Sequence, residues 1–233
     1  EVAEEINHTN INSRYLPNLT LGSNLIATSE MADISDSGII IFCVPSDAFR
    51  EVSDLASNYI KEESFLVTAT KGVEKDGFSL MSNILADYFP NNAIGVLSGP
   101  NLAEEIASNH LSGTVIASEN EILAQTIIKG LSTEFFRVYE NDDPYGVEMG
   151  GALKNIYAIA AGISDGLNLG ENARSALITR SFVEISRFAL FFKSKKETLF
   201  GLSGLGDLML TCNSSKSRNT NFGIKIANIK HKN

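Results

Sequence analysis

The sequence of 233 residues lacks the features that mark several large classes of protein. It has no apolar run near the roughly 20 residues that a membrane-spanning helix needs, so we expect no membrane span. Its two cysteines, Cys43 and Cys212, are too few for a disulfide framework, which favours a reducing, cytoplasmic location. We also predict no metal site.

A G-x-G-x-x-G fingerprint, which marks dinucleotide-binding domains when it follows a strand, is absent. The segment Gly201–Gly206 (GLSGLG) has similar composition, but it lies between predicted helices and is not taken as a cofactor loop. The chain begins with Glu1, and its strand signals begin late. We therefore expect a fragment that lacks its N-terminal strand and glycine loop, that binds nucleotide poorly by itself and that tends to aggregate.

The net charge of −9 is divided unevenly along the chain. Residues 1–143 hold 7 Lys/Arg against 22 Asp/Glu, a balance of −15, and residues 144–233 hold 12 against 6, a balance of +6. The acidic first part argues against a nucleic-acid partner. The mildly basic second part suits a small anionic ligand.

The first part of the sequence alternates between apolar runs and amphipathic segments. Before residue 38 we expect a helix at Val2–Ile6, a loop at Asn12–Pro17, a short strand at Leu25–Thr28 and a helical turn at Met31–Ser35. Five strands are then predicted, at Gly38–Val44, Phe65–Ala69, Ile94–Leu97, Thr114–Ala117 and Phe135–Tyr139. Helices are predicted between them, at Ser46–Asn58, Leu80–Tyr88, Asn101–Ser108 and Asn120–Ser132. This alternation indicates a doubly wound α/β domain of Rossmann-like type.

Three positions in this domain carry further expectations. The continuous apolar run Gly38–Val44 is typical of a strand buried on both faces. Asn101 suits the N-cap of the helix that follows it. Ligands of such sheets bind outside the carboxyl ends of the strands, where Lys71 and Gly99 are expected to lie.

An acidic turn at residues 140–144 ends the alternation, so we place a domain boundary at residue 143. The first domain would be residues 1–143 and an all-α domain would be residues 144–233. Helices are predicted at Tyr145–Asp165, Asn172–Phe192, Leu208–Cys212 and Phe222–Ile229. The glycine-rich turn Gly201–Asp207 and a polar loop at Ser217–Asn219 separate them.

Lys154 is the residue of most chemical interest, because it lies inside the apolar helix predicted at residues 145–165. Helical spacing places it on a face of small residues with Gly151 and Ala158, where another group can approach the backbone closely. A lysine that loses hydration has a lowered pKa and can exchange a proton near neutral pH. The alternative is a lysine that extends to the surface from a core helix.

Two other side chains allow both a functional and a structural interpretation. Asp207 follows the glycine-rich turn and could be an N-cap. Arg218, between Ser217 and Asn219, offers a fork of donors that matches phosphate, although most such triplets are solvated loops.

Taken together, the motifs resemble the NAD(P)-dependent glycerol-3-phosphate dehydrogenases of bacterial type. The resemblance covers nearly the whole chain and implies a fragment that lacks the family's N-terminal glycine-rich loop and its C-terminal end. The matching segments are VPS at 44–46, TKG at 70–72, SGPN-L-A at 98–103, GVE-x-GGALKN at 146–155, AAGISDGL at 160–167, NARSALITR at 172–180, GLSGLGDL at 201–208 and SRN at 217–219.

The resemblance implies reversible hydride transfer between NADH or NADPH and dihydroxyacetone phosphate, which gives sn-glycerol 3-phosphate for glycerophospholipid synthesis. Lys154 matches the family's catalytic lysine. The residues that match substrate-contacting positions are Lys71, Gly99, Asn101, Lys154, Asp207, Ser217, Arg218 and Asn219. Cofactor contacts match Lys71, Ala103 and Arg218, and Thr211 is a further polar candidate for the substrate. Many bacterial members have Ser or Thr where this chain has Asn101.

Two other functions and one assembly state stay open from the sequence. The chain could be another two-domain NAD(P)-dependent reductase that acts on a 2-keto acid, although such an enzyme needs a carboxylate site, whereas Arg218 and Lys71 suit a phosphate dianion. It could also be a non-catalytic fragment that keeps only the fold. A homodimer is compatible with the family.

Overall fold

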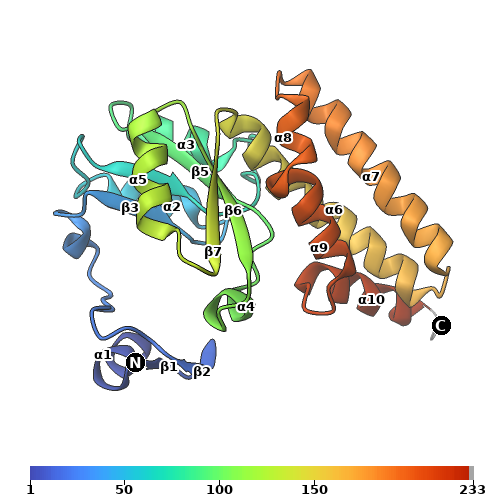
Figure 1. The fold of residues 1–233 in the computed structure, drawn as a ribbon, viewed down its shortest axis with the longest axis horizontal. Coiled ribbons are helices and arrows are strands. Elements are labelled where there is room, and N and C mark those ends of the chain that lie inside the picture. Colours follow the sequence, from blue (N-terminus) through green and yellow to red (C-terminus); the bar gives the residue numbers. More distant parts are fainter. Residues whose placement is uncertain (231–233) are drawn as a thin grey trace.

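The computed structural model describes residues 1–230, which form a mixed β-sheet with flanking helices followed by a region made only of helices (Figure 1). We call residues 38–143 the α/β region and residues 144–230 the helical region. The predicted fold class, a Rossmann-like sheet followed by helices, is therefore confirmed. Within residues 1–230, no helix combines the length and the apolar character that crossing a bilayer requires.

The sheet of the α/β region has five strands in the order β3-β4-β5-β6-β7. The strands are β3 (Ile39–Phe42), β4 (Phe65–Thr68), β5 (Ile94–Ser98), β6 (Ser112–Ser118) and β7 (Phe136–Asn141). Strands β3, β4 and β5 are parallel, β6 pairs antiparallel with β5, and β7 is parallel to β6. The carboxyl ends of β4 and β5 therefore lie at the same edge of the sheet as the amino ends of β6 and β7.

Helices cover both faces of this sheet and bury its central strands. They are α2 (Phe49–Ala56), α3 (Met81–Tyr88) and α5 (Glu121–Leu131), and the short α4 (Ala103–Ala107), which has no buried residue, follows β5. Consecutive residues of β4 face opposite sides: Leu66 packs with Phe42 and Phe49 beneath α2 and α3, and Val67 packs with Leu123 beneath α5. Burial of β4 on both faces explains its unbroken apolar sequence.

Strand β3 departs from the expectation that it is buried on both faces. Ile39 and Ile41 are 39% and 37% exposed on one face of β3, whereas Ile40 and Phe42 on the other face pack beneath α2 and α3. Strand β3 is also an edge strand that pairs only with β4 among the described residues. The N-cap predicted at Asn101 is also wrong. Helix α4 begins at Ala103 with Leu102 as its N-cap, and the Asn101 side chain instead donates a hydrogen bond to Thr114 Oγ1 at 2.9 Å.

The first part of the segment before residue 38, with α1 (Val2–Thr9), β1 (Ile11–Asn12) and β2 (Leu16–Thr20), lies apart from the sheet, whereas Met31 and Ile34 pack against the core beneath α2 and α3 (Figure 1). The segment contains the predicted helix as α1 and the predicted helical turn as η1 (Met31–Ile34). The loop expected at residues 12–17 is shorter: a turn at residues 13–15 joins a small antiparallel pair of strands, β1 and β2. The strand expected at residues 25–28 does not form.

The helical region is organised around the long helix α6. Its helices are α6 (Pro144–Gly166), α7 (Glu171–Phe191), α8 (Lys196–Phe200), α9 (Asp207–Asn213) and α10 (Arg218–Lys230), with a π-helical turn, η2 (Leu202–Gly206), before α9. Helix α8 was not predicted, and η2 replaces the expected glycine-rich turn. Helices α6 and α10 pack closely at Gly223. A Cβ at this position would lie only 2.1 Å from the carbonyl oxygen of Ile159, so the contact requires a glycine.

Helix α6 joins the two regions, because its first turns pack on the sheet and its remainder packs on α7, α9 and α10. Val147, near its start, packs with Val96 and Val115 on the sheet face that α2 and α3 also cover. The predicted small-residue face is buried, with Lys154 6% exposed and Ala158 0% exposed. The lysine is therefore held inside the junction between the regions and does not extend to the surface.

Candidate active site

Two lysines from different regions meet at one buried carboxylate. Lys154 Nζ, on α6, donates a hydrogen bond to Asp207 Oδ1 and another to Thr211 Oγ1 at 2.8 Å. Lys71 Nζ, which follows β4, donates to Asp207 Oδ2 at 2.5 Å and to the carbonyl oxygen of Gly99 at 2.7 Å. Asp207 is only 1% exposed. One negative charge is thus shared between two positive ones, which leaves a local excess of positive charge for an anionic ligand.

Burial lowers the pKa of Lys154 to about 8, and the positive charge of Lys71 acts in the same direction. The carboxylate of Asp207 opposes both effects, because it favours the charged ammonium. The outcome is an amine that changes protonation near neutral pH while it stays fixed by hydrogen bonds. Such an amine can donate a proton to a bound oxygen and can accept it again.

Asp207 is not an N-cap, so the structural interpretation of this residue is wrong. It is the first residue of α9, with Gly206 as the N-cap, and its side chain points to the two lysines. The turn η2 that delivers it packs tightly on α6: a Cβ on Gly150 would lie 2.7 Å from the carbonyl oxygen of Ser203. A second glycine of α6, Gly151, faces the sheet, where a Cβ would lie 2.7 Å from Ser98 Oγ. Both glycines therefore serve close packing.

The carboxyl end of β5 supplies the polar groups nearest to Lys71. Thr114 Oγ1 donates to the carbonyl oxygen of Ser98 at 3.1 Å and accepts from Asn101. Gly99 leaves no room for a side chain, because its Cβ would lie 3.0 Å from Thr114 Cα. Among the described residues, Ser98 Oγ and Asn101 Oδ1 are buried without a hydrogen-bond partner, so this edge offers two free polar atoms to a ligand.

A cavity of about 220 Å³ opens beside this cluster, between the two regions. Its lining joins residues of both regions: Asn101, Leu102, Lys154, Asp207, Leu210, Thr211, Ser214, Lys216, Ser217, Arg218 and Asn219. The predicted polar loop at Ser217–Asn219 is instead the start of α10, where Ser217 Oγ accepts from the backbone N–H of Thr220 at 3.2 Å. The N-terminal end of a helix favours anions, so Arg218 stands where a positive field already exists.

Three residues of this site were not singled out from the sequence. Lys216 bridges the cavity mouth, with Nζ 3.0 Å from Glu104 and 3.8 Å from Glu105 on α4. Asn155 Oδ1 accepts from Asn219 Nδ2 at 2.8 Å. Ser98 contributes one of the unpartnered oxygens. Each is a sequence neighbour of a predicted residue, and Ser98 and Asn155 also lie in segments that match the family.

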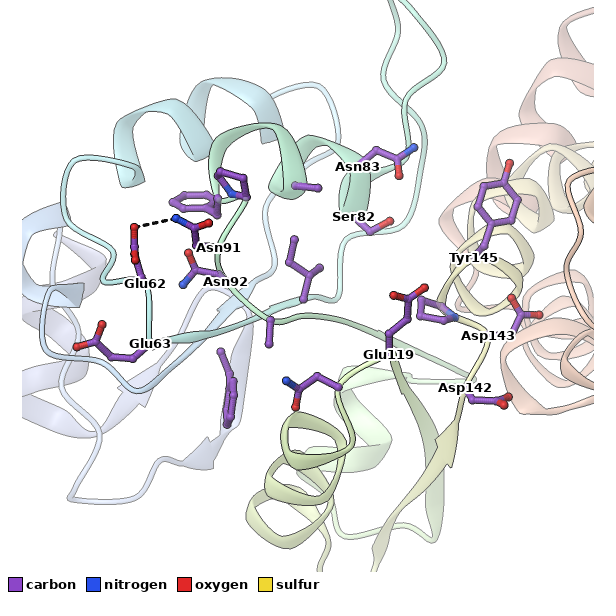
Figure 2. A pocket seen from close by; sticks show the side chains of 18 of the residues that line it. Glu62, Glu63, Ser82, Asn83, Asn91, Asn92, Glu119, Asp142, Asp143 and Tyr145 are labelled. Atoms are coloured by element: carbon purple, nitrogen blue, oxygen red, sulfur yellow. Dashed lines mark hydrogen bonds between the residues drawn. The ribbon is translucent and has the colours of Figure 1, made fainter.

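Some predicted site residues lie outside the cavity. Lys71 lies behind the cavity lining, where it donates hydrogen bonds to the lining residue Asp207 and to the carbonyl oxygen of Gly99. Ala103 is an exposed residue at the start of α4. A larger cavity of about 940 Å³ lies at the opposite edge of the sheet and contains none of the predicted residues (Figure 2). Carboxylates such as Glu62 and Asp142 line it together with Lys193 and Lys195, and Lys195 is paired with Asp142 at 2.5 Å. We therefore take the smaller cavity as the site.

Both regions of the chain are similar to known proteins. Residues 1–124 match the family model described as NAD-dependent glycerol-3-phosphate dehydrogenase N-terminus, and residues 143–233 match the corresponding C-terminus model. A glycerol-3-phosphate dehydrogenase [NAD(P)+] of Alcanivorax borkumensis is 47% identical over 97% of this chain and 66% of its own length. One from Acinetobacter baumannii is 48% identical over 97% of the chain and 63% of its own length.

A solved structure agrees with these matches. The crystal structure of glycerol-3-phosphate dehydrogenase from Coxiella burnetii superposes with a TM-score of 0.94 at 42% identity, over 97% of this chain and 70% of that one. The chain thus spans slightly less than two thirds of the length of the curated relatives it matches.

Proposed function

Because the chain belongs to the NAD-dependent glycerol-3-phosphate dehydrogenase family, we propose that the protein catalyses the reversible reduction of dihydroxyacetone phosphate to sn-glycerol 3-phosphate. The observation that carries this proposal is the buried Lys154, whose pKa is lowered to about 8 and which hydrogen-bonds to Asp207 beside a cavity of about 220 Å³. The product would serve glycerophospholipid synthesis.

Lys154 is the proton donor in this proposal. As the ketone carbon is reduced, its oxygen gains negative charge and needs a proton, which an ammonium of lowered pKa supplies readily. In the reverse direction the neutral amine accepts the proton of the alcohol. Asp207 and Thr211 hold the amine in place from two sides, which limits the motion that would misdirect the proton.

Arg218 is the proposed phosphate ligand, with Ser217, Asn219 and Lys71 as further donors. A guanidinium offers two parallel N–H groups to one phosphate, and the start of α10 adds its own field. Asn219 is held by Asn155 and Lys71 by Gly99, so neither side chain must be ordered when substrate binds.

NAD or NADP is the proposed cofactor, and it supplies the hydride when bound. The residues fit such a group at the carboxyl end of β5, because the unpartnered hydroxyl oxygen of Ser98 can accept from an amide N–H. Lys71, Ala103 and Arg218 are the residues that we assign to it. Asn101 also lines the cavity, and we assign its side chain to the substrate.

The test is a steady-state assay on the purified protein as its gene encodes it, which follows oxidation of NADH and NADPH. Dihydroxyacetone phosphate should be turned over, and a 2-keto acid such as ketopantoate should not. Turnover of the keto acid alone would support the other reductase function. No turnover of either substrate by folded protein that binds the reduced cofactor would support a non-catalytic role.

We further propose that the protein is a cytoplasmic homodimer. Each chain would consist of a cofactor-binding domain up to residue 143 and a substrate domain after it. Both cysteines are free, Cys43 on the surface and Cys212 in the interior, which suits a reducing compartment. Exposed aromatic side chains at the end of α7, among them Phe191 at 81%, support association of two copies.

A further inference from the structure

Glu148 is a buried carboxylate that the proposed mechanism does not use. It lies on α6, six residues before Lys154, and is only 3% exposed. Its Oε1 accepts a hydrogen bond from the backbone N–H of Ser82 at 3.0 Å, and its Oε2 accepts from the Ser82 hydroxyl. Figure 2 shows Ser82 at the start of α3, on the side that faces α6 and Tyr145. A helical-region side chain thus binds the first turn of an α/β-region helix.

This contact supplies a cap that α3 does not make for itself. The N-cap residue of α3 is Leu80, whose side chain cannot accept a hydrogen bond from the free N–H groups of the first turn. Ser, Thr, Asp or Asn normally provides that acceptor. Here Glu148 provides it from 66 residues away along the chain, and a carboxylate at a helix N-terminus also interacts favourably with the helix dipole.

The capped end of α3 is also one end of the segment that carries Lys71. After Lys71 the chain forms a short hairpin, in which Val73 pairs with Leu80 and the N–H of Glu74 donates to the carbonyl oxygen of Ser79 at 2.8 Å. Leu80 and Val73 pack against Met149, the residue that follows Glu148. Two adjacent contacts therefore fix the hairpin to α6: the apolar contact at Met149 and the Ser82–Glu148 hydrogen bonds.

The same helix fixes the other lysine. A Cβ on Gly151 of α6 would lie 3.6 Å from Lys71 Cγ, so the Lys71 side chain runs along α6 one turn before Lys154. If the hairpin moved away from α6, Lys71 would leave Asp207 and the cavity beside Lys154 would open to water. The relative position of the two lysines depends on how the hairpin is attached.

We propose that Glu148 is a positioning residue: it caps α3 across the junction and thereby holds the Lys71 hairpin on α6, so that Lys71 and Lys154 reach the same carboxylate. The inference rests on the proposed function for its catalytic consequence, but the positioning can be measured without turnover. The pKa of Lys154 serves as that measurement, because both its burial and the charge of Lys71 lower it.

The experiment uses competitive acetylation of amines across pH, with peptide mass spectrometry, to obtain the Lys154 pKa in the protein as its gene encodes it. Glu148→Ala should raise this pKa toward the ordinary value of lysine, because Lys71 withdraws and water enters. Loss of a negative charge alone would lower it instead, so the sign separates positioning from a direct field effect. In the same variant kcat/KM for dihydroxyacetone phosphate should fall about tenfold or more.

Three further variants make the result decisive. Glu148→Gln should keep the wild-type Lys154 pKa and most of kcat/KM, because its amide can accept from the Ser82 N–H and donate to the Ser82 hydroxyl. Ser82→Ala removes only the hydroxyl hydrogen bond to Glu148, so it should raise the Lys154 pKa less than Glu148→Ala does. It also provides the test if Glu148→Ala fails to fold. The matched control is Asp143→Ala, which removes a buried carboxylate cap that accepts at 2.8 Å from Gly146 at the start of the same helix.

The proposal is overturned if Glu148→Ala leaves the Lys154 pKa unchanged or lowers it, if Glu148→Gln is as damaging as Glu148→Ala, or if Asp143→Ala raises the pKa equally. Absence of turnover in the wild type would contradict the proposed function and leave the acetylation result to decide on the positioning.

Discussion

Lys71 and Lys154 lie 83 residues apart in the sequence and in different regions of the fold, yet they bind the two oxygens of one carboxylate. That carboxylate, Asp207, is 1% exposed, so the three charges interact with little screening by water. A buried carboxylate with two lysines leaves net positive charge beside the cavity. The arrangement requires both regions and the junction between them.

The first prediction concerns Lys154. Lys154→Met removes the proton donor but keeps a side chain of similar length, so we expect turnover to fall by a factor of at least roughly 10² with cofactor binding retained. A steady-state assay, together with fluorescence titration of the reduced cofactor, measures both quantities. Near-normal turnover would show that another group supplies the proton.

The second prediction concerns pH. In the proposed reaction, reduction of the ketone needs protonated Lys154, so kcat/KM in that direction should fall as the pH rises through about 8, the pKa to which burial lowers this lysine. Oxidation of the alcohol needs the neutral amine and should show the opposite trend. Because the charge of Asp207 raises this pKa, Asp207→Asn should move the fall to lower pH. A profile that does not move in Asp207→Asn would contradict the assignment.

The third prediction concerns stability and Glu148. Burial raises the pKa of this carboxyl from 4.5 to about 7, and the hydrogen bonds from Ser82 offset only part of that rise. Between these two values the folded state holds a proton that the unfolded state has released, so the stabilisation present below pH 4.5 is lost as the pH rises to about 7. The loss is of the order of 3 kcal/mol for a shift of this size. Urea denaturation at pH 5 and pH 8 should show a smaller difference in Glu148→Gln than in the wild type.

Much of the fold could be predicted because strands β4 to β7 and the long helices carry strong periodic patterns. The edge position of β3 could not, since an unbroken apolar run such as GIIIF does not reveal whether a second strand pairs with it, and Ile39 and Ile41 proved exposed. The hairpin of β1 and β2 was missed because its sequence is polar and contains Pro17.

The sequence predicted one central residue of the site, but not the contacts that this residue makes. Lys154 could be singled out by itself, because a charge within an apolar helix is visible locally. Its contact with Asp207 and the capping of α3 by Glu148 depend on packing between segments that are 53 and 66 residues apart, and no local pattern encodes such contacts. Resemblance to a family gave Asp207 a place in the site, and it included Glu148 in a matching segment without giving it a role.

The fourth prediction concerns the ion pairs of Lys216 with Glu104 and Glu105 across the cavity mouth. We expect Lys216→Ala to raise the Michaelis constant for dihydroxyacetone phosphate by up to about fivefold, because these exposed pairs are weak and screened by salt. Glu104→Gln with Glu105→Gln should raise it as well if the pairs help to close the mouth. If the double variant lowers the constant instead, Lys216 binds the phosphate directly and the carboxylates only compete for it.

The fifth prediction concerns Arg218 and the phosphate. A guanidinium can make two parallel hydrogen bonds to one phosphate, and a lysine ammonium cannot reproduce that fork. Hydrogen bonds to charged groups contribute about 1.5–3 kcal/mol each, so Arg218→Lys should raise the Michaelis constant for dihydroxyacetone phosphate by roughly tenfold or more. The constant for the reduced cofactor should rise less.

Dihydroxyacetone without its phosphate is the control substrate for Arg218→Lys. It cannot make the interaction that the substitution damages, so its low kcat/KM should change much less than that of the phosphorylated substrate. An equal loss for both substrates would mean that Arg218 supports the start of α10 or the cofactor. In that case the phosphate would have to bind at the remaining positive groups of the site, Lys71 and Lys216, and substitution of either should then have the selective effect expected here of Arg218.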